Sequence, residues 1–262
     1  MISPSNHPQP APRSRAIAAA AAAAAARQRS TRLKVEGFVA GLCFLAGTGI
    51  IGAPLARSLW TLGCDDFVLV DQTEYIAEDV GQECGPEEIG NSKASVVSRR
   101  LENRGAWAYA THTLREIFDP IFRPEVSFII DAGGSPHSAA EIGSIAHEAE
   151  VPLFRVRVDP TTDVLEIRVF RHDGNLARCP HCDAAPLSEN YTAPAPPSRA
   201  AAELTAQWAA QLILASLEDR GTALGDGQTA TYRPRSGEGK QHREGRRCPA
   251  CASRSPLNPV GR

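Results

Sequence analysis

The sequence lacks any long run of large apolar side chains, which excludes a membrane-spanning helix, because such a helix needs about 20 consecutive apolar residues. It also lacks an excess of either charge, since 28 basic and 30 acidic residues give a net charge of −2. Proteins that bind nucleic acids or membrane surfaces usually carry a strong basic imbalance. We therefore expect a soluble protein with neither nucleic acid nor membrane as a partner.

Large side chains are scarce at the start of the chain, where a proline- and serine-rich stretch leads into an alanine tract. Alanine favours helix but offers little apolar surface to bury. No internal repeat is present, so a solenoid is excluded. We expect residues 1–32 to form a disordered or loosely helical arm, and residues 33–262 to hold one large domain.

The clearest local pattern begins with the apolar run Phe38–Ala46, which predicts a buried strand. A glycine-rich turn follows at residues 47–52, and a helix with an apolar face follows the turn. Phe67–Val70 then predicts a second strand that ends at Asp71. This strand, helix and strand unit is typical of a parallel sheet.

The rest of the chain continues the alternation of strands and helices. Two of the later strands are separated by a short polar connection, as in a hairpin. The predicted fold is α/β, with a Rossmann-like, mostly parallel sheet and antiparallel strands near the C-terminus. The expected strands are Val126–Ile130, Leu153–Val158 and Val164–Phe170. One helix is expected after Asn91 and Ser92, either of which can cap it, and two more are expected at Ser138–Glu148 and Arg199–Leu217.

The turn matches the fingerprint G-x-G-x-x-G at Gly47, Gly49 and Gly52. Glycines permit a tight turn and let backbone amides approach a phosphate at the start of a helix. Asp71, at the end of the next strand, is placed to accept hydrogen bonds from ribose hydroxyls. Together these residues predict a site for an adenine nucleotide; the alternative is a tight turn with Asp71 on the surface.

Two cysteine pairs of the C-x-x-C type predict a zinc site. Each pair can point two thiolates at one ion, and four thiolates fill a tetrahedral shell. Such a closed shell has no open position, so the metal is expected to be structural. Zinc needs thiolates rather than disulfides, which favours a reducing, cytoplasmic compartment. The four predicted ligands are Cys179, Cys182, Cys248 and Cys251.

In combination, these motifs resemble the ThiF/MoeB/HesA family, relatives of the ubiquitin-activating enzymes. The resemblance covers roughly Val35 to Cys251. Leu69-Val-Asp71 is similar to the strand that ends in the family's ribose-binding acid. The segment Ile89–Lys93 is similar to the family's G-x-x-K, whose lysine contacts the ATP phosphates, and Asp131 is similar to the first acid of the D-x-x-D-N segment.

The resemblance implies an ATP-dependent adenylyltransferase. Members of the family activate the C-terminal carboxylate of a ubiquitin-like carrier protein or peptide by attack on the ATP α-phosphate, with magnesium on the same oxygens. They are commonly homodimers in which an N-terminal arginine reaches the neighbouring nucleotide. Arg27, Arg29 and Arg32 are the candidates for that arginine here.

Several positions depart from the family pattern. Asp79 stands where the family has asparagine, and Gln82 stands where it has an arginine that contacts the nucleotide. Gly134 replaces the usual magnesium ligand, so Asp131 is the carboxylate that would have to substitute. No cysteine lies between the two pairs, which argues against a covalent thioester with the carrier.

Three functions therefore remain open. The first is adenylation of a carrier or peptide, at an active or a catalytically diverged site. The second is a zinc-stabilised adaptor that binds nucleotide or peptide without turnover. The third is an NAD-dependent oxidoreductase, since the glycine fingerprint and Asp71 alone would also serve NAD.

Overall fold

The computed structural model of the chain describes residues 41–64, 66–101, 106–109, 114–118, 125–159, 164–171, 196–218, 224, 228–233, 236 and 238–243. All of them belong to one compact unit that spans Val39–Arg262. The predicted arm at residues 1–32, its three candidate arginines and the four predicted zinc ligands lie outside the described residues.

The strands that the structure describes form one eight-stranded sheet in the order β3-β2-β1-β4-β5-β6-β7-β8. The first five pair in parallel, and β6, β7 and β8 continue the sheet as antiparallel strands. The predicted Rossmann-like sheet with antiparallel strands at its C-terminal side is thereby confirmed. The strands are β1 (Leu42–Ala46), β2 (Phe67–Val70), β3 (Ala106–Tyr109), β4 (Val126–Asp131), β5 (Leu153–Asp159), β6 (Val164–Phe170), β7 (Gln228–Arg233) and β8 (Glu238–Arg243).

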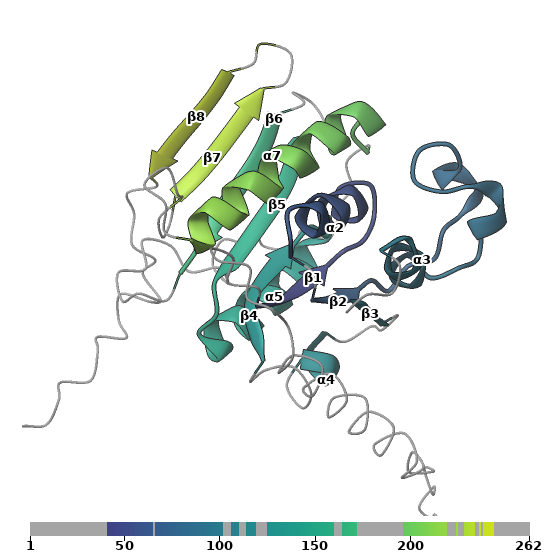
Figure 1. Ribbon diagram of the computed structural model, residues 1–262, viewed down its shortest axis with the longest axis horizontal. Coiled ribbons are helices and arrows are strands. Elements are labelled where there is room, and N and C mark those ends of the chain that lie inside the picture. The colour runs from purple at the N-terminus through teal and green to yellow at the C-terminus, as the bar shows by residue number, and fades with distance from the viewer. Residues whose placement is uncertain are drawn as a thin grey trace, which may run out of the picture. The chain divides into compact units, whose positions relative to one another are not determined.

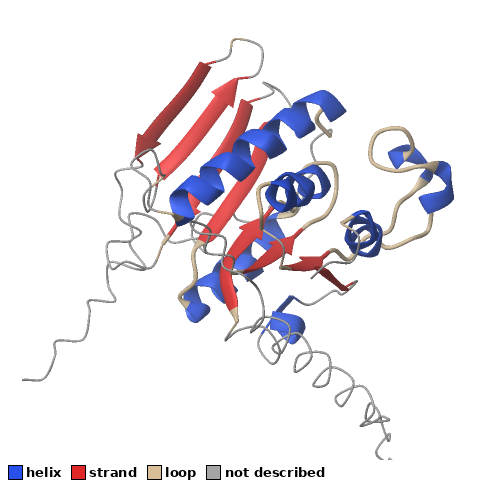
Figure 2. Ribbon diagram, in the orientation of Figure 1, coloured by secondary structure: helices blue, strands red, loops and turns tan. Residues whose placement is uncertain are grey.

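Helices cover both faces of the sheet (Figures 1 and 2). Helices α2 and α7 lie side by side on one face, and α4 and α5 pack together on the other. No helix among the described residues has the length and apolar character that crossing a membrane requires. The helices are α2 (Gly52–Thr61), α3 (Lys93–Arg100), α4 (Leu114–Ile117), α5 (Pro136–Ala149) and α7 (Arg199–Leu217), with short 3-10 turns at Ala77–Asp79 and Pro86–Glu88.

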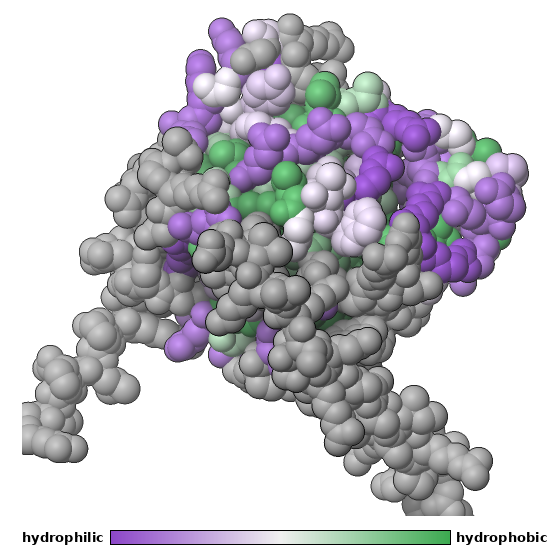
Figure 3. All heavy atoms as spheres, in the orientation of Figure 1, coloured by the Kyte–Doolittle hydropathy of each residue, from purple (hydrophilic) through white to green (hydrophobic). Residues whose placement is uncertain are grey.

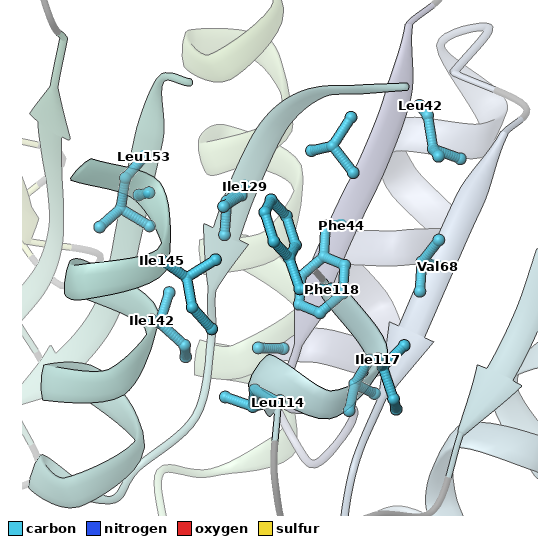
Figure 4. Close-up of a cluster of buried hydrophobic side chains, with 14 of the residues drawn as sticks. Leu42, Phe44, Val68, Leu114, Ile117, Phe118, Ile129, Ile142, Ile145 and Leu153 are labelled. Carbon is cyan, nitrogen blue, oxygen red and sulfur yellow. The ribbon is translucent and has the colours of Figure 1, made fainter. Parts of the chain in front are cut away.

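The core on the α4 and α5 side is built from alternate residues of the strands (Figure 4). Phe44 of β1 meets Phe118 edge to face, with ring centroids 5.3 Å apart. Ile142 and Ile145 of α5 close the same cluster. Because strand side chains alternate between faces, the other residues of β1 point toward α2, and the whole strand is buried. This burial on both faces explains why the sequence of β1 is a continuous apolar run.

Most predicted elements are confirmed within one or two residues at each end. Ser92 caps α3 as expected, since its side chain accepts a hydrogen bond from the backbone N–H of Ser95. The sequence analysis did not predict β7 and β8, whose residues are mostly polar. In the structure, Tyr232 of β7 stacks on Trp208 of α7, with ring centroids 5.5 Å apart, and this contact joins the hairpin to the helix.

Candidate functional site

The glycine turn connects β1 to α2 at the carboxyl ends of the parallel strands. Gly47 has φ of 89°, a conformation that favours glycine, and a Cβ there would lie 2.6 Å from the backbone nitrogen of Gly133. A Cβ on Gly52 would collide with the carbonyl group of Gly47. Packing within the protein therefore requires glycine at two of the three fingerprint positions.

The middle glycine of the fingerprint is different. A Cβ on Gly49 would meet a single group within 4 Å among the described residues, the Glu83 carboxylate, whose Oε2 lies 3.6 Å away. No packing requirement for glycine is therefore visible at this position. A glycine here instead keeps the backbone accessible from the side on which Glu83 lies, as binding of a phosphate by the turn would require.

Asp71 organises the loops around the turn. Its Oδ2 accepts hydrogen bonds from the backbone N–H and the hydroxyl of Thr48, at 2.7 and 3.2 Å. Its Oδ1 accepts from the backbone N–H and the hydroxyl of Thr73, at 2.9 and 2.6 Å. A ribose hydroxyl would have to share an oxygen with one of these groups, and the Thr73 hydroxyl can rotate away because it is exposed.

Lys93 lies at the first position of α3 and is held by two carboxylates. Its Nζ is 3.1 Å from Asp79 Oδ2 and 3.1 Å from Glu83 Oε2, and its side chain is 12% exposed. The ammonium also lies over the ring of Tyr75, 5.1 Å from the centroid. The lysine that the sequence reading assigned to a nucleotide phosphate is thus already paired within the protein.

The charges of this group change one another's proton affinity. Burial raises the pKa of Glu83 above its usual range, and the nearby Lys93 offsets this only in part. Burial by itself would lower the pKa of Lys93, but the Glu83 and Asp79 carboxylates outweigh it and raise that pKa. The lysine therefore stays charged at neutral pH, while burial disfavours the charged form of the carboxylate beside the turn.

A small pocket opens beside the turn, between α2, α3 and the start of α7. Gly49 and Ile50 contribute the turn, and Gln82 and Glu83 contribute the segment between β2 and α3. Figure 3 shows hydrophilic residues gathered over this part of the molecule. The remaining lining residues are Ala53, Pro54, Arg57, Val97, Arg100, Leu101, Arg199 and Glu203.

The three arginines that line the pocket all have partners in the protein. Arg57 Nη2 donates to both carboxylate oxygens of Glu203, at 2.7 and 2.5 Å, and this pair joins α2 to α7. Arg100 pairs with Glu88 and donates to the backbone carbonyl of Glu83. Arg199 donates to the carbonyl of Gly81 at 3.4 Å. The pocket lining therefore holds these three cations together with two acids, Glu83 and Glu203.

Asp131, at the end of β4, has a different environment from the one expected. Its side chain is fully buried, and its Oδ2 accepts from Arg155 at 2.9 Å and from Arg157 at 2.8 Å. Arg155 also donates to the carbonyl of Ala139 in α5. A magnesium ion at this carboxylate would have to displace two guanidinium groups, which speaks against Asp131 as a replacement for the missing metal ligand.

The structure brings some predicted site residues together and separates others. Gly49, Gln82 and Lys93 lie around Glu83, whereas Asp131 does not line the described pocket. The sequence reading missed Glu83 entirely. The sequence did contain a sign of the pairing at Asp131, because β5 is an apolar strand with two arginines at alternate positions, Arg155 and Arg157. Such arginines inside a buried strand indicate a nearby buried carboxylate that they neutralise.

Metal ligands are not evident in this part of the chain. Across the residues that the structure describes, no group of three or more histidine, cysteine, aspartate or glutamate side chains is arranged to hold a metal ion. The predicted four-cysteine zinc site falls outside the described residues and stays a prediction.

The sequence matches no protein-family model, and no curated protein matches it. Solved structures do match. Escherichia coli MccB in a structure with ATP has a TM-score of 0.64 and 15% identity over 80% of this chain and 66% of its own. MccB with N-formylated MccA has a TM-score of 0.63 and 13% identity over 80% and 67%. PaaA has a TM-score of 0.60 and 14% identity over 78% and 64%.

The chain thus spans about two thirds of the length of the solved proteins that it matches. The identities of 13–16% with these proteins carry information about the fold only. MccB and PaaA are E1-like adenylyltransferases of the ThiF/MoeB kind. The chain has their fold.

Proposed function

We propose that the protein is an ATP-dependent adenylyltransferase that activates the C-terminal carboxylate of a peptide or a ubiquitin-like carrier protein, and that it works as a homodimer. The observation that carries this proposal is the open face of Gly49 beside the pocket, with the Glu83 carboxylate in contact with Lys93 next to it, in the fold of MccB. MccB has been solved with ATP and with MccA. In a sheet of this type, ligands bind at the carboxyl ends of the strands.

In the proposed reaction, an oxygen of the substrate carboxylate forms a bond to the α-phosphorus of ATP. The bond from that phosphorus to the bridging oxygen of the β-phosphate breaks, and pyrophosphate leaves. The backbone amides at the start of α2 would bind a phosphate oxygen, and Lys93 would stabilise the charge that builds up on the phosphates. Asp71 would hold the ribose, and Gln82 would offer only an uncharged amide where a cation is usual.

A non-catalytic nucleotide- or peptide-binding adaptor is the second candidate. Two observations favour it: Lys93 is neutralised by Asp79 and Glu83, and Asp131 is committed to two arginines. Neither group is poised to act on a phosphate without a rearrangement. An NAD-dependent oxidoreductase is the third candidate, and tighter binding of NAD than of ATP would support it.

The combined substitution Gln82→Arg and Gly134→Asp is expected to raise the rate of ATP–pyrophosphate exchange by as much as about a hundredfold, and to make it depend on magnesium. The double variant restores both charged partners of the phosphates. Gln82 lines the pocket, and a Cβ on Gly134 would meet no atom within 4 Å in the described part of the chain. Each single change should help less, because both groups act on the same charge.

The assay measures exchange of labelled pyrophosphate into ATP with candidate peptides and carrier proteins. The matched control is Gln211→Arg, which adds the same charge at an exposed position of α7. We expect slow exchange and weak magnesium dependence in the wild type. Fast wild-type exchange would show that another group supplies the missing charge, and no gain in the double variant would favour the adaptor.

Purification under reducing conditions is expected to yield about one zinc ion per chain, bound by the two cysteine pairs. Elemental analysis by mass spectrometry measures this ratio. Cys179→Ser should lower the zinc content and the unfolding temperature, while ATP affinity at the glycine turn changes little. Cys64→Ser, at a buried cysteine within the described residues, is the control that should keep the zinc. Metal-free wild-type protein would refute the site.

A further inference from the structure

One carboxylate oxygen lies where a bound phosphate would be expected. Glu83 Oε2 is 3.6 Å from the position of a Cβ on Gly49, and the same oxygen is 3.1 Å from the Nζ of Lys93. It therefore lies between the open face of the glycine turn and the ammonium group. An oxygen of a phosphate that is bound by both the turn and Lys93 would need this same place.

The Glu83 side chain is held there with little access to water, at 11% exposure. Its backbone is fixed at both ends, because its N–H donates to the Asp79 carbonyl at 2.8 Å and its carbonyl accepts from Arg100 at 3.1 Å. Only the side chain is therefore free to leave while the segment keeps its fold. Burial raises the pKa of this carboxyl group. The charged carboxylate is therefore less stable in this position than it would be in water, which lowers the cost of moving it out.

Lys93 would keep its position if Glu83 moved. Its second partner, Asp79, is anchored independently, since Asp79 Oδ2 also accepts the backbone N–H of Ile76 at 3.0 Å. The ring of Tyr75 supports the ammonium from another side. Removal of the Glu83 carboxylate would thus leave a positioned lysine with one of its two counter-charges, facing the glycine turn.

Building on the proposed function, we propose that Glu83 determines which ligands the site accepts. Its carboxylate imitates a ligand phosphate at the turn and at Lys93, and a nucleotide binds only by displacing it. The wild-type site should therefore discriminate against nucleotides in proportion to the negative charge that they bring to the turn. Adenosine brings none, AMP brings a single phosphate, and ATP brings the most.

The test is calorimetric titration of adenosine, AMP and ATP into the wild type, Glu83→Gln and Glu83→Ala. We expect Glu83→Gln to bind ATP about tenfold more tightly than the wild type or better, because a like charge within a few ångströms of the phosphates is removed. The gain for AMP should be smaller, and adenosine affinity should stay the same. Glu83→Ala should give the same order of gains in affinity, largest for ATP and absent for adenosine. This second variant excludes a new hydrogen bond from the glutamine amide as the cause of the gain.

The matched control is Glu78→Gln, which removes one negative charge from an exposed position of the same segment and should leave all three affinities unchanged. ATP binding by the wild type that Glu83→Gln leaves unchanged or weakens would overturn this inference, while the proposed function would stand. Equal gains for adenosine and ATP would also overturn it, because they would indicate a change of shape rather than of charge. No binding of any nucleotide to any variant would overturn both the inference and the proposed function.

Discussion

Gly52→Ala is expected to lower the free energy of unfolding by about 3 kcal/mol or more, at the upper end of the cost of overpacking. The new Cβ would collide with the carbonyl group of Gly47, and both colliding groups are fixed by the main chain. The turn would then have to open, and Gly47 would lose its close contact with Gly133. Thermal unfolding should show a decrease of roughly 10 °C for a domain of this size.

Gly49→Ala provides the matched control, since it adds the same methyl group to the same turn. Its Cβ would meet only the Glu83 carboxylate, at an ordinary contact distance of 3.6 Å. We expect this variant to unfold within a few degrees of the wild type. Equal destabilisation by the two substitutions would contradict the division between structural and open glycines in the turn.

Asp131→Ala is expected to cost about 3–5 kcal/mol, as is typical when one partner of a buried ion pair is removed. The Arg155 side chain is only 4% exposed, so the substitution removes a fully buried counter-charge that lies 2.9 Å from its guanidinium group. Arg155 also contacts the Ala139 carbonyl and the ring of Phe170, 5.5 Å from the ring centroid, and both of these groups are neutral. Urea unfolding monitored by circular dichroism measures the loss.

The control for a general effect of ion pairs is Glu203→Ala, which breaks the exposed pair with Arg57. Side-chain exposures of 32% for Glu203 and 56% for Arg57 place this pair in water, where such pairs contribute about 0–1 kcal/mol. If Asp131→Ala were as stable as this control but lost activity, Asp131 would act on the ligand rather than on the fold. Such a result would restore it as a candidate metal ligand.

The sequence predicted the first strand, helix and strand well because each signal there is local. The apolar run of β1, the glycine fingerprint and the short strand before Asp71 follow one another without interruption. Their relation in space is fixed by the handedness of the crossover. The hairpin of β7 and β8 was missed because its residues are polar and its edge strand is exposed. Alternating apolar residues, the usual sign of a half-buried strand, are absent there.

The site itself was predictable only in part. Asp71 and the glycines lie at strand ends whose positions follow from the topology. The contacts of Lys93 do not follow from the topology. The segment from Glu74 to Ser92 leaves the sheet and returns to it, and its path depends on tertiary contacts such as the bridge between those two residues. Similarly, the partners of Asp131 come from β5, a different strand, so no spacing in the sequence indicates that pairing.

The central claim is that the glycine turn binds the phosphates of an adenine nucleotide. Calorimetric titration of ATP into the wild type and Gly49→Val tests it most directly, because the valine side chain would fill the open face of the turn. The control substitution Gly49→Ala shows whether a side chain at this position affects folding. We predict measurable binding by the wild type at millimolar ATP or below and at least about a tenfold loss in Gly49→Val. Failure of the folded wild type to bind ATP, AMP or NAD at millimolar concentration, or equal ATP binding by Gly49→Val, would contradict the claim.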